Sequence, residues 1–307
     1  MVPGLAAFEC PKKPAAGDIV AETALDCPWA GTARELSEKA GKGEALGPVF
    51  SAYAPGIVKQ LAADRADPAV KQLWGESINF DEMENDVIVL PALLSFMASE
   101  LGVAQPKGKY VHAGMEHTYG YLFSLLETKF GFKRARWVND DIAGGLGIPD
   151  GLVGPASAEG TLLSNITCMA GGIALKDDAA AAGLLKNLRC PAALRKYIAA
   201  KIPRFRLTET VVLPGSRTVV LRTDFVPFNK TSAGGNSHLL IYSVYDSAYK
   251  KASLITAFPV ARSFMQNAAD PKGLGAGKPV QTRYNAWVEG LTGGKVKGLR
   301  AASWLDR

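Results

Sequence analysis

The stretch TETVVLPGSRTVVLRTDFV, residues 208–226, contains two runs rich in valine and threonine on either side of Pro214-Gly215-Ser216. β-Branched residues favour extended backbone, whereas proline and glycine between two such runs are typical of a turn. The stretch therefore predicts a β-hairpin with strands over residues 208–213 and 217–226.

Two further runs, His238 to Tyr245 and Ala252 to Val260, flank a polar turn at Asp246 and predict a second hairpin. Four successive strands joined by turns predict an antiparallel meander in the second half of the chain. After Arg262 the strand and helix signals weaken, and repeated glycines favour a loop-rich tail.

The first hundred residues have the apolar periodicity of helices instead. We expect helices over residues 32–40, 45–64 and 84–101. Pro55-Gly56 predicts a break inside the second helix, and Gly102 predicts the end of the third.

The middle of the chain has mixed signals. Residues 119–125 alternate like a strand, and a turn at residues 128–131 predicts a hairpin that returns through residues 132–138. Residues 161–175 also have strand character, and residues 179–200 favour two short helices divided at Cys190-Pro191.

These elements predict an α+β fold. A helical N-terminal region, residues 1–106, should pack on a mainly antiparallel β-sheet region, residues 107–307, that contains two internal helices. The linker between the two regions is short, so the pattern allows one continuous domain as well as two.

Composition excludes a disordered chain, because 48% of the 307 residues are hydrophobic and 21% are charged. No apolar stretch reaches the roughly 18 residues that a membrane span needs, so we expect no transmembrane segment. The net charge of +6 divides unevenly: residues 1–155 carry 14 Lys or Arg against 20 Asp or Glu, and residues 156–307 carry 21 against 9. A basic half is suited to an anionic substrate, and a nucleic acid is possible but not favoured because the basic residues are dispersed.

The four cysteines form two local pairs, Cys10 with Cys27 and Cys168 with Cys190, without the spacing of a metal site. Two disulfides and hence a secreted or periplasmic location are the favoured interpretation, and four buried free thiols are the alternative. The N-terminus lacks a basic segment followed by an apolar one, so we expect that a signal peptide is absent from this chain.

Two of the three histidines fall in one window, His112-Ala-Gly-Met-Glu-His117. On a helix the two imidazoles would be about 140° apart, and on a strand they would point to opposite faces. His112 and Glu116 share a face in either case, whereas His112 and His117 would converge only through a bend at Gly114. The window thus offers an imidazole and a carboxylate for acid–base chemistry, a partial divalent metal site, or a structural polar cluster.

The third histidine, His238, follows the glycine-containing loop at residues 231–237 and begins a predicted strand. The loop matches neither a phosphate-binding motif nor a nucleophile elbow. Oxygen ligands at Asp140, Asp141 and Asp150 do not have the spacing of a calcium loop, so no complete motif supports a metal ion.

The leading hypothesis is a secreted or periplasmic, hydrolase-like enzyme that acts on a small polar or anionic substrate. Its catalytic residues would be His112, Glu116, His117 and His238. The alternative from another class is a non-catalytic exported binding or structural protein whose histidines only pack.

A second alternative follows from Ile255-Thr-Ala-Phe-Pro259, which resembles the final strand of small metal-independent ribonuclease toxins. The resemblance implies that His117 and His238 act as base and acid on a phosphodiester and that Thr256 stabilises charge. The phosphate would then be bound by a basic side chain, for which Arg217, Arg222 and Lys250 are the candidates.

Overall fold

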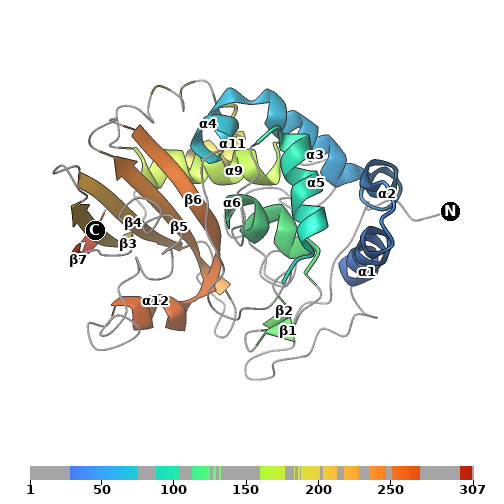
Figure 1. Ribbon diagram of the computed structural model, residues 1–307. Helices are drawn as coiled ribbons and strands as arrows, with labels where there is room; N and C mark the ends of the chain where they lie inside the picture. The colour runs from blue at the N-terminus through green and yellow to red at the C-terminus, as the bar shows by residue number, and fades with distance from the viewer. Residues whose placement is uncertain are drawn as a thin grey trace.

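The computed structural model places a β-sheet on one side of the molecule and most of the helices on the other (Figure 1). It describes residues 28–74, 88–103, 113–124, 127–128, 131–132, 160–176, 183, 186, 188–200, 203–212, 218–227, 236–246, 251–269 and 298–305. The predictions for Cys10, Cys27, His112, the three aspartates and Lys250 therefore lie outside the described residues, as does Arg217. The α+β class predicted from the sequence is confirmed.

The main sheet has five strands in the order β6-β5-β4-β3-β7, and every neighbouring pair is antiparallel. The bounds are β3 (Arg204–Val212), β4 (Thr218–Pro227), β5 (Asn236–Asp246), β6 (Lys251–Ala261) and β7 (Gly298–Leu305). Strands β3 to β6 pair in chain order, which confirms the predicted meander. The sequence did not predict β7, which lies in the glycine-containing tail and pairs with β3.

The N-terminal helices confirm the predicted break and end. They are α1 (Pro28–Gly41), α2 (Leu46–Tyr53), α3 (Pro55–Ala66), α4 (Pro68–Trp74) and α5 (Pro91–Leu101). Gly102 closes α5 in the left-handed conformation at φ 67°, which costs glycine little. Pro91, expected inside the third helix, instead begins it, because a first-turn residue needs no N–H for the helix ladder.

The predicted strand over residues 161–175 is wrong, because the chain forms helix α9 (Leu162–Met169) and continues as π-helix η2 (Ala170–Ala174). Thr161 caps the start of α9 reciprocally with Ser164. The Thr161 hydroxyl accepts from the Ser164 backbone N–H, and the Ser164 hydroxyl accepts from the Thr161 backbone N–H. All eight residues of α9 are buried. A helix that is buried on every side has no polar face, so its short apolar run resembles a buried strand.

The predicted strand over residues 119–125 is also wrong, because α6 (Ala113–Met115) leads into π-helix η1 (Glu116–Gly120), which remains helical to Leu122. The aromatic side chains of this segment are buried around the turn instead of alternating between two faces. The turn at residues 128–131 is confirmed, since β1 (Glu127–Thr128) pairs antiparallel with β2 (Gly131–Phe132).

Helix α9 lies at the centre of the helical layer and packs against α3, α4, η1 and α11 (Ala192–Ala199). The predicted pairing of Cys168 with Cys190 is present as a disulfide, which joins α9 to the segment before α11. On the sheet, β6 contacts α4, α6 and η1, so these three elements pack on the edge of the meander. Helix α12 (Arg262–Ala269) follows β6 directly and packs against β5 and β6 (Figure 1).

Candidate functional site

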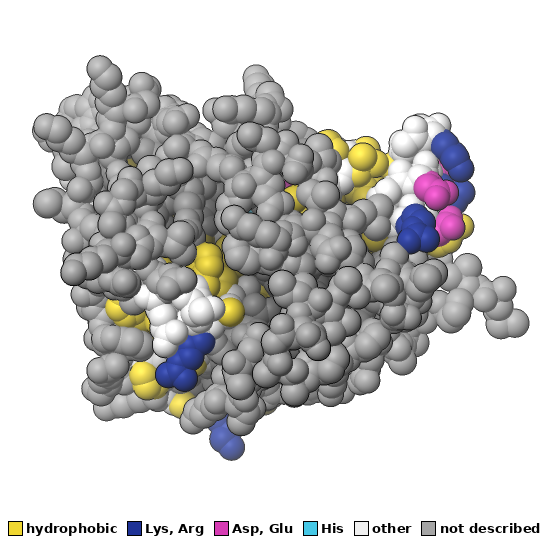
Figure 2. All heavy atoms as spheres, turned by 90° about the horizontal axis from the view of Figure 1, so that it is seen from below, with side chains coloured by type: hydrophobic (Ala, Val, Ile, Leu, Met, Phe, Trp, Pro, Cys, Tyr) yellow, Lys and Arg dark blue, Asp and Glu magenta, His cyan; other side chains and the backbone are white. Residues whose placement is uncertain are grey.

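Glu116 and His117 are adjacent residues of η1 and lie in the protein interior, with 5% and 6% of their surfaces exposed. A π-helix is a widened helical turn, and such turns occur often at functional sites. Here the turn packs on β6, so the imidazole of His117 faces the edge strand of the meander. No described histidine reaches the surface on the face shown in Figure 2.

The His117 ring is held by a side chain from β6. Its Nδ1 atom lies 2.8 Å from the Thr256 hydroxyl oxygen, and the Thr256 hydroxyl donates to the Ala113 carbonyl at 3.3 Å. A hydroxyl has a single proton, so when Thr256 donates it to Ala113, it accepts from His117. In that arrangement the Nδ1 atom carries a proton, and the Nε2 atom faces Glu116.

The Nε2 atom of His117 faces the carboxylate of Glu116, with 3.9 Å between Nε2 and Oε2. This separation exceeds that of a hydrogen bond but is short enough for strong charge coupling. A proton on Nε2 would convert the neighbours into an ion pair.

Two aromatic rings enclose this pair. The His117 ring centroid lies 4.9 Å from that of Tyr121 and 5.0 Å from that of Phe258. Aromatic surroundings exclude water and lower the local dielectric constant, so the charge coupling between Glu116 and His117 is stronger than on the surface.

His238 lies elsewhere on the same sheet. It is opposite Val260 on β6, whereas Thr256, the partner of His117, is opposite Tyr242. Four strand residues separate the two positions, a distance of about 13 Å at the usual rise. The structure thus brings Glu116, His117 and Thr256 together, whereas His238 lies four strand positions from the residue opposite Thr256.

The environment of His238 favours its neutral form. Burial, helped by the positive charge of Arg262, lowers the pKa of His238 to about 4. A neutral imidazole at physiological pH is able to accept a proton only weakly.

A second buried polar cluster, which the sequence analysis missed, surrounds Asp64 in α3. Its carboxylate accepts from the hydroxyls of Tyr119 and Thr161, and so connects α3 with η1 and α9. The sequence did contain a signal for this cluster, because Ile57, Leu61 and Asp64 have the spacing of one helix face, and that face is buried. An acidic residue on a buried face needs hydrogen-bond partners.

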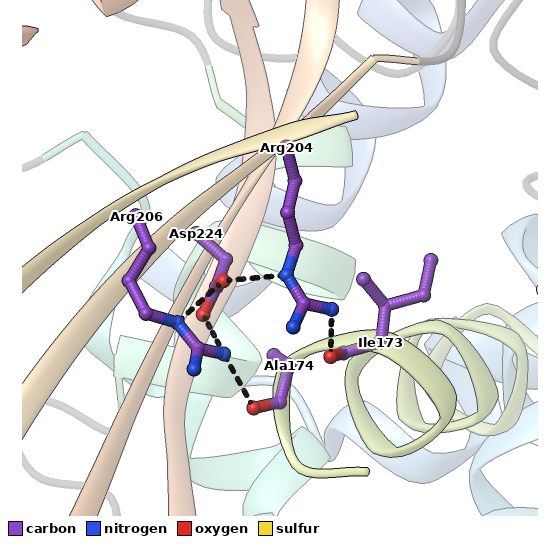
Figure 3. Close-up of polar contacts among 5 residues, drawn as sticks. All are labelled: Ile173, Ala174, Arg204, Arg206 and Asp224. Carbon is purple, nitrogen blue, oxygen red and sulfur yellow. Dashed lines mark hydrogen bonds and ion pairs between the residues drawn. The ribbon is translucent and has the colours of Figure 1, made fainter. Parts of the chain in front are cut away.

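A third cluster lies where β3 and β4 meet the end of η2 (Figure 3). Asp224 accepts from Arg206 through both oxygens, at 2.9 and 3.1 Å, and lies 3.4 Å from the Arg204 Nε atom. The guanidinium groups also donate to the carbonyls of Ile173 and Ala174. Two guanidinium groups share the single carboxylate of Asp224, and the carbonyls at the negative end of the helix dipole complement the remaining positive charge. The cluster therefore joins η2 to β3 and β4, and we call it the clamp on η2.

Within the described ranges, no group of three or more His, Cys, Asp or Glu side chains is placed to hold a metal ion. None of the helices described there combines the length and apolar character that a membrane crossing requires. A small cavity of about 10 Å³ beside Asp64 is lined mostly by apolar residues, Trp74 and Leu163 among them, and is too small for a substrate.

Comparisons with protein-family models, curated proteins and solved structures gave no match to this chain. The functional argument therefore starts from the geometry of the described side chains.

Proposed function

We propose that the protein is an exported hydrolase-like enzyme that acts on a polar or anionic substrate, with Glu116 and His117 as its acid–base pair. The observation that carries this proposal is the contact of His117 with Thr256. Because Thr256 donates to Ala113, it holds His117 in one tautomer and one ring orientation. Thr256 is therefore a positioning residue.

The proposed chemistry uses the Nε2 atom of His117, which faces Glu116. Nε2 of the neutral imidazole accepts a proton from water or a substrate hydroxyl, and the nucleophile then attacks the substrate. The carboxylate of Glu116 stabilises the imidazolium that forms, and Nε2 later returns the proton to the leaving group. The aromatic rings of Tyr121 and Phe258 strengthen this stabilisation by excluding water.

Two further features support export and the substrate class. The Cys168–Cys190 disulfide is typical of a protein from an oxidising compartment. The excess of Lys and Arg in residues 156–307 favours an anionic substrate.

The test compares the wild-type protein with E116Q and H117Q on nitrophenyl esters, phosphate monoesters, phosphodiesters and glycosides. We expect hydrolysis of one class and a loss of about 10²- to 10⁴-fold in both variants. E38Q, on the exposed face of α1, is the control and should keep full activity. Full activity of folded E116Q and H117Q on the hydrolysed class would refute the assignment.

The second candidate is a non-catalytic exported binding or structural protein. It is favoured by the burial of Glu116 and His117, of which only 5% and 6% of the surface is exposed. Absence of hydrolysis in all four classes, together with strong destabilisation of H117Q, would support this candidate. The ribonuclease alternative needs His117 and His238 on one phosphodiester, and we do not propose it because the strand register separates them.

A further inference from the structure

Asp64 is 1% exposed, yet its two carboxyl oxygens have hydroxyl partners from different elements. The Tyr119 hydroxyl donates to Oδ2 at 2.6 Å, and the Thr161 hydroxyl donates to Oδ1. The carboxyl group is therefore the point at which α3, η1 and the first turn of α9 meet.

The Tyr119 hydroxyl has one proton and two acceptors within reach. Its oxygen lies 2.6 Å from Asp64 Oδ2 and 3.2 Å from Gln60 Oε1. The Leu162 backbone N–H donates to the same Gln60 atom at 2.9 Å, which identifies that atom as the amide oxygen. Tyr119 is thus able to donate in either of two directions.

These two directions match the two protonation states of Asp64. When Asp64 is ionised, Tyr119 donates to it. When Asp64 carries a proton on Oδ2, that proton is donated to the Tyr119 oxygen, and the Tyr119 hydroxyl turns to Gln60. Thr161 donates to Oδ1 in both states, so neither state leaves these groups without a partner.

The surroundings set the pH at which the states exchange. Burial raises the pKa of Asp64 to about 7, and the negative charge of Asp67 acts in the same direction. The hydrogen bonds from Thr161 and Tyr119 lower it. Gln60 on α3 and Ser164 on α9 complete the polar groups of the cluster, and neither is charged.

We propose that Asp64, Tyr119 and Gln60 form a buried proton-binding relay, which makes the junction of α3, η1 and α9 sensitive to pH. Loss of the proton leaves a buried carboxylate held by hydroxyl donors, and the junction weakens. The relay does not depend on the proposed enzymatic function, although Tyr119 is only two residues from His117 in η1.

The experiment is a pH titration of the full-length protein labelled with carbon-13 at the aspartate carboxyl carbons, followed by NMR. The Asp64 signal is assigned as the one missing in D64N. We expect its midpoint near pH 7 in the wild-type protein. If D64N does not fold, the signal that moves in both Gln60 variants below identifies Asp64.

Two substitutions at Gln60 test the relay itself. Q60L removes the acceptor of the protonated state, so the affinity of Asp64 for its proton should fall about tenfold, a shift of about one pH unit. Q60E keeps an acceptor and adds a negative charge, so the midpoint should rise. A buried relay is overturned if every aspartate of the wild-type protein titrates below about pH 5, or if Q60L leaves the midpoint near 7 unchanged.

Discussion

The Nδ1 atom of His117 on η1 lies 2.8 Å from the Oγ1 atom of Thr256 on β6, although 139 residues separate them along the chain. The bond forms across the boundary between the helices and the sheet. It therefore ties the orientation of the proposed acid–base residue to the packing of η1 on the edge of the meander.

Replacing Thr256 by valine removes the hydroxyl but keeps the branched shape of the side chain. We expect T256V to lower kcat about 10- to 100-fold with a smaller change in KM, because the imidazole loses the group that fixes its tautomer. T256S keeps the hydroxyl and should restore most of the activity. NMR of the imidazole nitrogens reports the tautomer directly, and an unchanged Nδ1–H tautomer in T256V would contradict this role.

Part of this site could be predicted from the sequence. The shortage of histidines made the 112–117 window conspicuous, and its residues Glu116 and His117 lie in a buried turn. The pair that the spacing favoured, His112 with Glu116, stays a prediction because His112 lies outside the described residues. The contact with Thr256 could not follow from spacing, because it depends on how a helix packs on a distant strand. Asp64 had a local signal in its helical spacing, but its partners Tyr119 and Thr161 are also distant in sequence, 55 and 97 residues away.

Asp64 should make the stability of the protein fall as the pH rises. Folding raises its pKa from the ordinary value of 3.8 to about 7, so the folded protein binds the proton more tightly than the unfolded chain. This contribution is fully present below about pH 4 and is lost as the pH approaches 7, with an upper limit on the order of 4 kcal/mol.

D64N carries an amide in place of the protonated carboxyl group and should not show this loss. The difference between the free energies of unfolding of D64N and the wild-type protein, measured by urea titration, should shift in favour of D64N between pH 4 and pH 8. E38Q, which changes an exposed carboxylate, provides the control. Parallel pH profiles of D64N and the wild-type protein would show that Asp64 does not bind the proton.

The clamp on η2 should be sensitive to the loss of its single carboxylate. D224N leaves the guanidinium groups of Arg204 and Arg206 buried without their anionic partner, and we expect a loss of about 3–5 kcal/mol in the free energy of unfolding. Chemical denaturation measures it. The solvent-exposed pair Lys39–Glu44 serves for comparison, since K39M should have little effect on the free energy of unfolding. Equal losses in D224N and K39M would mean that the clamp contributes little.

The disulfide between Cys168 and Cys190 closes a segment whose ends are 22 residues apart. In the chain-entropy account, its removal increases the freedom of the unfolded chain and costs about 3 kcal/mol. We therefore expect C168A/C190A to unfold at lower urea concentration than the wild-type protein under non-reducing conditions. A reducing agent should destabilise the wild-type protein more than the double variant, and equal effects would indicate that this bond is not the one being reduced.

The fold was predictable where the sequence pattern matches local geometry. The antiparallel pairing of β3 with β4 was expected from the proline and glycine between their sequences, and the helix end was expected from Gly102. Helix α9 was predicted as a strand because burial on all sides removes the polar face that reveals a helix. Strand β7 was missed because its pairing with β3 joins distant parts of the chain.

Gly172 in η2 lies so close to α11 that a side chain would not fit. A Cβ atom there would be 2.4 Å from the Cγ2 atom of Ile198, so either this side chain or the turn has to move. We expect G172A to lower the free energy of unfolding by about 1–3 kcal/mol. The matched control is G47A in α2, where a Cβ atom meets nothing within 4 Å and alanine should be neutral or stabilising. The double variant G172A/I198A tests the cause, because alanine lacks the Cγ2 atom of Ile198. Its loss should be smaller than the sum of the losses in G172A and I198A, and additive losses would place the strain elsewhere in η2.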